Sequence, residues 1–462
     1  MYIKRFFCYT FRIQFLQFIR SILCKAVFPM QKNQKLTLVI LIQAALISTA
    51  YASEQSEAKG FVEDAAGSVL FRTGYISRDK KNGIADTSSL AQTAIVKLDS
   101  GFTQGVVGFG VGVVGDGSFK IGKNAHAGNN MIPLKNDGAR DANGHVDPYD
   151  HWARGGANVK ARISNTTAVY GTQVLDIPVL ASNTARLVPE YFTGTLITSH
   201  EIKDLELTLG KFTKNQYSDQ INTDGNELGR AVVWGAKYKF DDQLNGSYYG
   251  VDIKDKLERH YANVNYKQAL TNDRSLTYDF SGYHTEFEPG VTYSATGAAD
   301  EDKTNNIWAL SGTYNQGSHN VMLAYQQNTG NVGYDYGLGK GVADGGQSIY
   351  LPNSYLSDFI GNHEKSAQVQ YSYNFANQGL AGLNWTSAFV YGWDIKVNNV
   401  TDNAQEREFF NQVKYTVQSG VAKDASLRVR NSYYRASDAY QDVYIGDTNE
   451  WRIFLDIPVK LF

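Results

Sequence analysis

Cysteine is almost absent from the 462-residue sequence, and both cysteines, Cys8 and Cys24, lie near its start. From residue 53 onward the chain has none, so this part forms no disulfide and ligates no metal through thiolates. Long apolar runs are missing as well. Beyond residue 52 no stretch approaches the roughly 20 residues that a membrane-spanning helix requires. If this part of the chain crosses a membrane, it does so with strands.

Charged residues are sparse, at 19% of the chain. Seven of the 44 Lys and Arg residues but none of the 46 acids precede residue 53, so the remainder is acidic, which disfavours nucleic acid as a partner. The HExxH, GxSxG and GxxxxGK[ST] motifs are absent, so we expect neither an enzyme nor a cofactor. Residues 137–150 lack the regular order of a calcium loop, and we expect no metal there.

Tyrosine and glycine are abundant, with 30 and 43 residues. Strand formers and turn formers therefore dominate over helix formers, which favours an all-β protein. The mean hydropathy is negative. An apolar run over residues 36–47 is preceded by Lys32 and Lys35 and followed by Ala50-Tyr51-Ala52.

That arrangement of basic, apolar and small residues predicts a secretory signal peptide in residues 1–52, with cleavage after Ala52. Because a signal normally begins at its initiating Met, we expect translation to start at Met30. The alternative is that residues 1–29, which are basic and apolar, form an amphipathic element. Residues 53–67 are interpreted as an N-terminal lead-in, and residues 68–462 as the main domain.

Short segments with alternating polarity recur along this domain, separated by turns rich in Gly, Asn and Asp. In residues 383–396, for example, Phe389, Trp393 and Ile395 lie on one side of an extended strand and Asp394 on the other. The same pattern is found in residues 231–240, 365–375, 412–418 and 451–462. Strands with one apolar and one polar face, repeated in this way, are typical of a transmembrane β-barrel.

The expected fold is therefore all-β, a transmembrane antiparallel β-barrel with inward-folded constriction loops. Closure is required because an unpaired backbone N–H or C=O in hydrocarbon costs several kcal/mol. About 400 residues, at about 22 per strand and connection, give about 18 strands. The alternative is a soluble β-sandwich or β-helix that buries the apolar faces in a core. Strand patterning starts too early for an N-terminal plug domain, which favours passive diffusion.

Several motifs spread over residues 57–462 have a common resemblance. They are EAKGFVED at 57–64, DSGFTQGVVGFGV at 99–111, PVL at 178–180, RLVP at 186–189, GGQSI at 345–349, QSG at 418–420 and RVR at 428–430. Together they closely resemble the OprD family of outer-membrane substrate-specific porins.

The resemblance implies a monomeric-type barrel of 18 strands in the outer membrane of a Gram-negative bacterium, with inward-folded loops that narrow the lumen. Members of the family take up amino acids and other small carboxylate-bearing solutes, and some admit carbapenem antibiotics. We therefore expect such solutes, outer-membrane lipids and, during biogenesis, the barrel-assembly machinery as partners. The oligomeric state is expected to be a monomer or a loose trimer.

Basic residues share the water-facing parity of several expected strands. They are Lys160, Arg162, Arg428, Arg430 and Arg452. Fixed positive charge along one wall of a narrow passage lowers the cost for a carboxylate to enter it. The resemblance assigns Arg78, Arg428, Arg430 and Arg452 to the basic ladder of the family, with Lys160 and Arg162 as neighbours.

The opposite wall is expected to recognise an ammonium or hydroxyl group, and the resemblance points to Tyr336, Ser354 and Asp358. Two departures from the family weaken lysine or arginine as the preferred solute. Gln347 stands where members for basic amino acids tend to have an acid, and Leu356 where an aromatic is often found.

Residues 177–190 lack alternation and contain Pro178, Arg186 and Pro189. This suits a constriction loop packed inside the barrel, with an ordinary extracellular loop as the alternative. The main functional hypothesis is selective passive diffusion of small carboxylate-bearing solutes. The alternatives are a general-diffusion porin with little selectivity, a barrel-borne hydrolase, and a structural or adhesive barrel.

Overall fold

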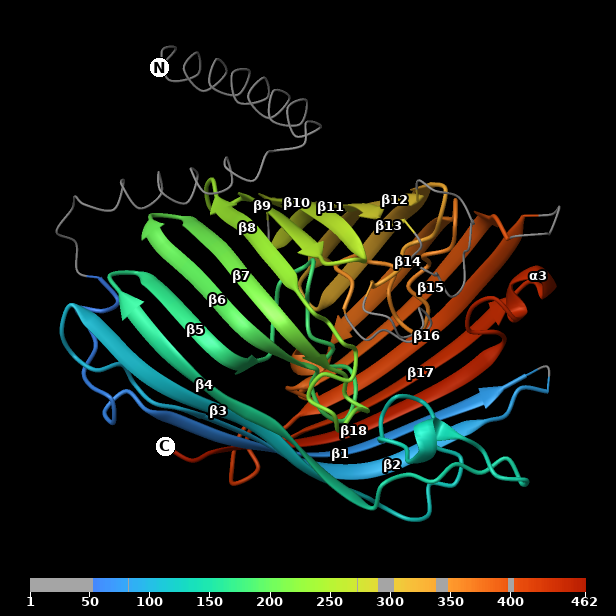
Figure 1. The fold of residues 1–462 in the computed structure, drawn as a ribbon. Helices are drawn as coiled ribbons and strands as arrows, with labels where there is room; N and C mark the ends of the chain where they lie inside the picture. Colours follow the sequence, from blue (N-terminus) through green and yellow to red (C-terminus); the bar gives the residue numbers. More distant parts are fainter. Residues whose placement is uncertain (1–52, 82, 272, 290–302, 338–347, 398–402) are drawn as a thin grey trace, which may run out of the picture. The chain divides into compact units, whose positions relative to one another are not determined.

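A single closed sheet of 18 antiparallel strands forms the protein in the computed structural model (Figure 1). The structure describes residues 53–81, 83–271, 273–289, 303–337, 348–397 and 403–462. The predicted signal region, residues 1–52 with Met30 and Ala52, and the family departure at Gln347 lie outside these ranges. The strands are β1 (Ala66–Lys80), β2 (Thr87–Asp99), β3 (Val107–Lys120), β4 (His151–Ile163), β5 (Thr166–Gln173), β6 (Tyr191–Ile202), β7 (Leu205–Gln216), β8 (Ala231–Lys239), β9 (Leu244–Ile253), β10 (Leu257–Ala269), β11 (Arg274–Phe287), β12 (Lys303–Gln316), β13 (His319–Gly330), β14 (Lys365–Asn374), β15 (Leu383–Ile395), β16 (Ala404–Thr416), β17 (Ser426–Ala436) and β18 (Thr448–Lys460).

Each strand pairs with its neighbours in sequence, and β1 also pairs with β18, so the sheet has no free edge. The prediction of an all-β antiparallel barrel of about 18 strands is therefore confirmed. Among the described residues no helix is long and apolar enough to span a membrane. A short helix, α3 (Asp438–Gln441), lies in the connection between β17 and β18.

Alternation along the strands separates two faces. On β14, Ser366 and Gln368 are buried on the inner side, whereas Val369 is 48% exposed on the outer side. On β18 the outer side carries Trp451 and Leu455, both more than two-fifths exposed. An exposed apolar exterior of this kind suits hydrocarbon, while the polar interior suits water.

One predicted side chain points the other way. Ile395 was expected on the outer face of its strand with Phe389, but it is fully buried and packs against Tyr440. The cause is an irregularity in the pairing of β15 with β16 between Gly392 and Ile395, where Asp394 has a φ of 63°. An extra residue at this position reverses the parity of everything after it.

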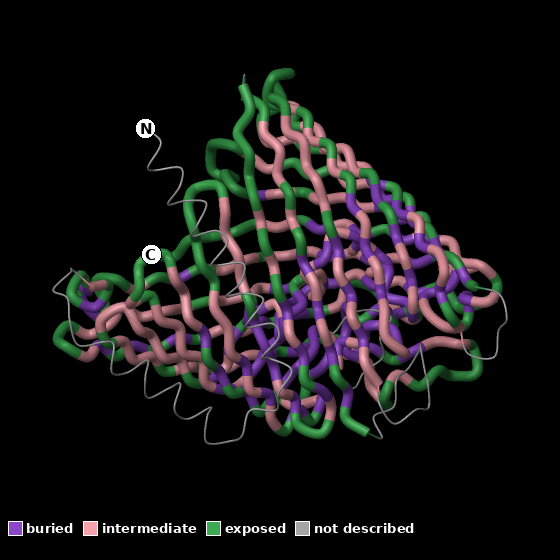
Figure 2. Tube along the Cα trace, turned by 90° about the horizontal axis from the view of Figure 1, so that it is seen from above, coloured by how far each residue is buried: buried purple, intermediate pink, exposed green. Residues whose placement is uncertain are grey.

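Burial is uneven along the strands. On β8, β10 and β16, the ends on the side of the barrel where the long connections lie alternate between buried and less buried residues, whereas the other ends are mostly exposed on both faces. Figure 2 shows the buried positions in purple gathered toward one end of the strands. In barrels of this class long loops are extracellular and short turns periplasmic. Long loops therefore fill the extracellular half of the lumen.

Residues 53–65, within the predicted lead-in, lie against the periplasmic end of the barrel. The Gln55 side chain is 3% exposed and donates from Nε2 to the carbonyl oxygens of Thr103 and Gly105, at 2.9 and 3.1 Å. The Gln55 side chain packs closely on Gly108 of the adjacent strand β3, where a Cβ would lie 2.3 Å from Gln55 Oε1 and would require the Gln55 amide to move. The first strand begins at Ala66, two residues before its predicted start.

Candidate functional site

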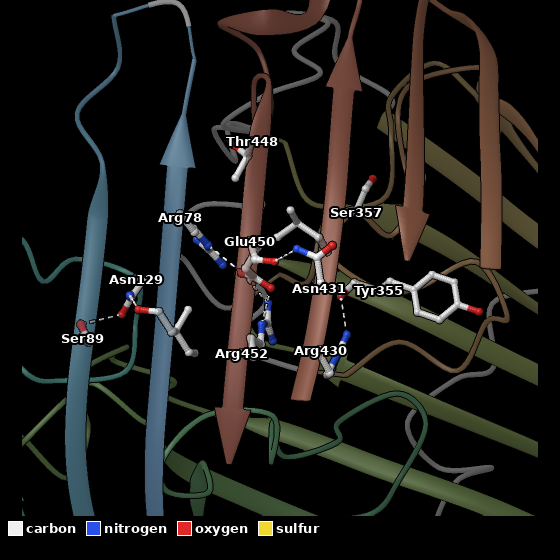
Figure 3. A network of polar contacts seen from close by, with 12 residues as sticks. Arg78, Ser89, Asn129, Tyr355, Ser357, Arg430, Asn431, Thr448, Glu450 and Arg452 are labelled. Atoms are coloured by element: carbon white, nitrogen blue, oxygen red, sulfur yellow. Dashed lines mark hydrogen bonds and ion pairs between the residues drawn. The ribbon is translucent and has the colours of Figure 1, made fainter. Parts of the chain in front are cut away.

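Three adjacent strands, β17, β18 and β1, carry most of the predicted basic ladder. In the strand register Arg430 stands opposite Arg452, and Glu450 stands opposite Arg78. Arg428 lies two residues from Arg430 and therefore on the same face. Figure 3 shows Arg78, Glu450, Arg452 and Arg430 following one another across these strands. The structure thus brings four predicted ladder residues together on one wall.

Glu450 also belongs to this wall and was not among the predicted site residues. Its side chain is almost fully buried, and its Oε2 accepts from Arg78 Nε at 2.8 Å and from Arg452 Nη2 at 3.0 Å. One carboxylate therefore holds two guanidinium groups and neutralises part of their charge. The signal in the sequence was its parity, since Glu450 and Arg452 share the polar side of the last strand.

Most of the N–H groups of Arg428 and Arg430 make no hydrogen bond to the described residues. Both side chains are partly exposed, whereas Arg78 and Arg452 are buried. In the described part of the chain Arg428 has no hydrogen bond or ion pair, and its guanidinium carbon lies 5.3 Å from the centre of the Phe454 ring. Arg430 donates from Nη2 to the Tyr355 carbonyl oxygen at 3.4 Å, and its Nε is buried without a partner. These two groups can receive an anion.

The periplasmic end of the row is formed by a further arginine. Arg72 makes a bidentate ion pair with Asp456, with Nε to Oδ1 at 2.7 Å, and also donates to the Arg186 carbonyl oxygen at 3.0 Å. Its guanidinium carbon lies 5.3 Å from the centre of the Phe454 ring, the same separation as that of Arg428. The Phe454 ring is therefore in contact with two cations of the row.

Lys160 and Arg162 do not join this row. They lie on β4, three strands beyond β1, near the turn that connects β4 to β5. Lys160 Nζ is 3.1 Å from Asp99 Oδ1, and Arg162 Nε donates to Gln55 Oε1 at 3.1 Å. The Arg162 guanidinium also lies 4.1 Å from the Phe102 ring centre. Their donors are engaged at the periplasmic mouth.

The connection between β5 and β6, residues 174–190, folds into the barrel. Pro189 and Arg186 are buried and Pro178 is partly buried. The Pro178 carbonyl oxygen accepts from Tyr283 Oη on β11, at 3.1 Å, and the Arg186 carbonyl oxygen accepts from Arg72 on β1. In a ring of 18 strands β1 and β11 are nearly opposite, so this loop crosses the lumen.

Buried Arg154 on β4 fastens the end of the same loop. It donates to the carbonyl oxygen of Pro189 at 2.7 Å and to that of Tyr217, in the connection between β7 and β8, at 2.5 Å. Asp116 on β3 pairs with it at 3.0 Å, and both side chains are fully buried. Deletion of a partner from a buried pair of this kind is costly, which makes Arg154 a structural anchor.

Tyr336, Ser354 and Asp358 are brought together in the connection between β13 and β14, residues 331–364. Tyr336 Oη donates to one oxygen of the Asp358 carboxylate and Ser354 Oγ to the other. Burial, together with the charge of Asp358, holds the pKa of Tyr336 well above its usual value, so the phenol stays a donor. The structure thus groups all three residues predicted for the opposite wall.

Two carboxylates on β16 hold this connection against the wall. Glu408 accepts from the backbone N–H groups of Leu356 and Ser357, and Glu406 accepts from Ser357 Oγ at 2.8 Å. Both carboxylates are almost fully buried. Leu356, at the position where the family often has an aromatic, packs with Tyr434. Nothing local in the sequence marks these contacts, because the partners are about 50 residues apart.

Within the described residues no group of three or more His, Cys, Asp or Glu side chains is arranged to hold a metal ion. The candidate site is the passage between the row of arginines and the inward loops. One wall presents guanidinium groups, the loop of residues 174–190 crosses the lumen, and a hydrogen-bonded carboxylate, Asp358, lies in the second inward loop, residues 331–364.

Known proteins have a similar sequence and fold. The model of the OprD family, described as outer membrane porins, matches residues 59–461. Porin D of Pseudomonas aeruginosa is 35% identical over 439 residues, which are 90% of this chain and 95% of that protein. The crystal structure of Acinetobacter baumannii OccAB1 superposes with a TM-score of 0.83 at 73% identity, over 89% of this chain and all of that one. The crystal structure of Pseudomonas aeruginosa OprD gives 0.73 at 33% identity, over 90% of this chain and all of that one.

Proposed function

Because the chain belongs to the OprD family of outer membrane porins, which are channels, we propose that it is a selective passive channel for small carboxylate-bearing solutes such as amino acids. The observation that carries this proposal is the pair of lumen-facing arginines, Arg428 and Arg430, whose donors are mostly unused.

A carboxylate that leaves bulk water loses hydration, and fixed guanidinium groups replace it. Arginine suits this role because its planar donors match a carboxylate in a bidentate fashion. Arg428 and Arg430 lie next to Arg452, so an anion can pass from one group to the next without being trapped. Glu450 and Asp456 moderate the row, because they neutralise part of the charge of their arginine partners.

The second wall supports a preference for solutes that also carry an ammonium or hydroxyl group. Asp358 is fixed by Tyr336 and Ser354, so its carboxylate has a set orientation. A zwitterion of amino-acid size can present its carboxylate to the arginines and its ammonium group to Asp358. The loop of residues 174–190 contacts nearly opposite strands through Pro178 and Arg186, and a passage narrowed in this way supports selectivity.

The test is to replace Arg428 and Arg430 by Gln, singly and together, and to measure reversal potentials in planar bilayers under a salt gradient. Anion preference is expected to fall in each single variant and further in the double variant. The matched control is R274Q, an exposed arginine at the periplasmic start of β11. Unchanged ion preference in the double variant would refute the role of the row.

Liposome swelling with amino acids, dicarboxylates and neutral sugars of similar size separates selectivity from general diffusion. Rates that depend on the carboxylate and on stereochemistry are expected. Rates that follow size alone would identify a general-diffusion porin.

A further inference from the structure

A buried arginine stands on the wall that carries no ladder. Arg259 on β10 is 1% exposed and points into the barrel. Within the described residues it has no ion pair with a carboxylate, although burial of an unpaired cation is costly. Arg154, the other deeply buried arginine that fastens a loop, does have such a partner in Asp116. The cost at Arg259 calls for a function that a neutral side chain would not serve.

All contacts of Arg259 are directed at one short segment of the second inward loop. Its Nη1 and Nη2 donate to the carbonyl oxygens of Tyr336 and Asp335, and its guanidinium carbon lies 4.2 Å from the Tyr334 ring centre. Its Nε donates to Thr285 Oγ1 on the next strand, β11, at 2.9 Å, and this bond fixes the plane of the guanidinium group. Two consecutive carbonyl oxygens and an aromatic face match the planar fork of arginine, and a lysine has no equivalent geometry.

The segment held in this way carries Tyr336, whose hydroxyl donates to Asp358. Asp358 lies in the same loop but 22 residues further along, and its backbone carbonyl accepts from Gln326 Nε2 on β13 at 3.0 Å. The carboxylate is therefore oriented from two sides. The hydrogen bond from Tyr336 to the Asp358 carboxylate depends on the position of the backbone at residues 335 and 336.

We propose that Arg259 is a positioning residue for cation recognition, which clamps residues 334–336 so that Tyr336 orients the Asp358 carboxylate toward the solute. The inference rests on the proposed function, because it takes Asp358 as the group that meets the ammonium end. Arg259 itself does not touch the solute, because its nitrogen atoms already donate to Thr285 and to the loop backbone.

A double-mutant cycle tests the connection. R259Q, Y336F, D358N and the double variant R259Q/D358N are compared by reversal potential and by uptake of a zwitterionic amino acid into liposomes. D358N is expected to shift the reversal potential toward anions and to slow uptake. R259Q and Y336F are expected to shift it in the same direction, by at least half as much. The double variant should match D358N alone, because Arg259 acts through that carboxylate.

R230Q is the matched control, since Arg230 pairs with Asp252 at a partly exposed position next to β8. If R259Q does not assemble, R259K serves in its place, because lysine keeps the charge but not the fork. A wild-type reversal potential in R259Q or R259K, or shifts that add up in the double variant, would overturn the inference while D358N remains effective. If D358N itself has no effect, the opposite wall of the proposed function fails and the inference fails with it.

Discussion

At the scale of single residues, the row of arginines is organised by one buried carboxylate. Glu450 holds Arg78 and Arg452, whereas Arg428 and Arg430 have no such partner. The row therefore contains two kinds of arginine. The first kind maintains the wall, and the second is available to solutes.

Replacement of Glu450 by Gln should reveal this division. The variant leaves Arg78 and Arg452 without their carboxylate, and loss of one partner of a buried pair costs about 3–5 kcal/mol. We expect a lower unfolding temperature in detergent, followed by circular dichroism, together with stronger anion selectivity. E286Q, at an exposed glutamate on β11, is the control. Equal unfolding temperatures for the two variants would show that Glu450 does not stabilise this wall of the barrel.

At the scale of elements, the inward loops are fastened by charged side chains of the strands. Arg154 holds the end of the loop of residues 174–190, and Glu406 and Glu408 hold the loop of residues 331–364. Ordering a long loop costs much conformational entropy, and buried charge-assisted hydrogen bonds offset this cost.

Substitution of Arg154 by Gln is expected to release the first loop. The carbonyl oxygens of Pro189 and Tyr217 lose their donor, and Asp116 is left buried without its cation. The single-channel conductance should rise and the selectivity among solutes should fall. R140Q, which removes a donor to the Gly144 carbonyl oxygen in an exposed loop, should change neither. A conductance equal to that of the unmodified protein would contradict the anchoring role.

Glu364, where the second loop meets β14, predicts a pH dependence. Burial raises its pKa well above the ordinary range, and the adjacent Glu406 raises it further. A free oxygen on each of these two carboxyl groups has no donor, so one shared proton suits the pair. The protonated form is favoured in the folded protein, and the stability that it confers is complete below pH about 4.5 and is lost as the pH rises through the elevated pKa.

The second loop should therefore loosen at alkaline pH, seen as larger conductance and more frequent current fluctuations. E364Q supplies a permanent donor in nearly the same shape and is expected to flatten this dependence. Other groups near the pair, Asp358, Tyr434 and Tyr440, are unchanged in that variant and serve as an internal control. An equal pH response in both proteins would exclude the carboxyl pair as its source.

The local sequence pattern was sufficient to predict the strands, because each strand meets hydrocarbon on one side and water on the other. The alternation failed at Ile395, where an irregular pairing near Asp394 reversed the faces. The loop contacts could not be read from the sequence. Arg259 and Glu408 look like ordinary polar positions of their strands, and only the folded chain brings the loop backbone to them.

At the scale of the whole molecule, the parity of Arg428, Arg430 and Arg452 predicted a common inward face, and the closed sheet of the structure places them on adjacent strands. Lys160 and Arg162 have the same parity but lie elsewhere around the ring. Parity defines the face of a strand but not its position around the barrel. That position depends on the number of strands and on closure.

The most direct test of the central claim compares uptake of an amino acid with uptake of its C-terminal amide. The two solutes match in size and ammonium group and differ in the carboxylate. In liposomes that contain the purified protein, the amino acid is expected to enter faster than the amide, and the difference should disappear in the R428Q/R430Q variant. Equal uptake of the two solutes by the unmodified protein would contradict the account.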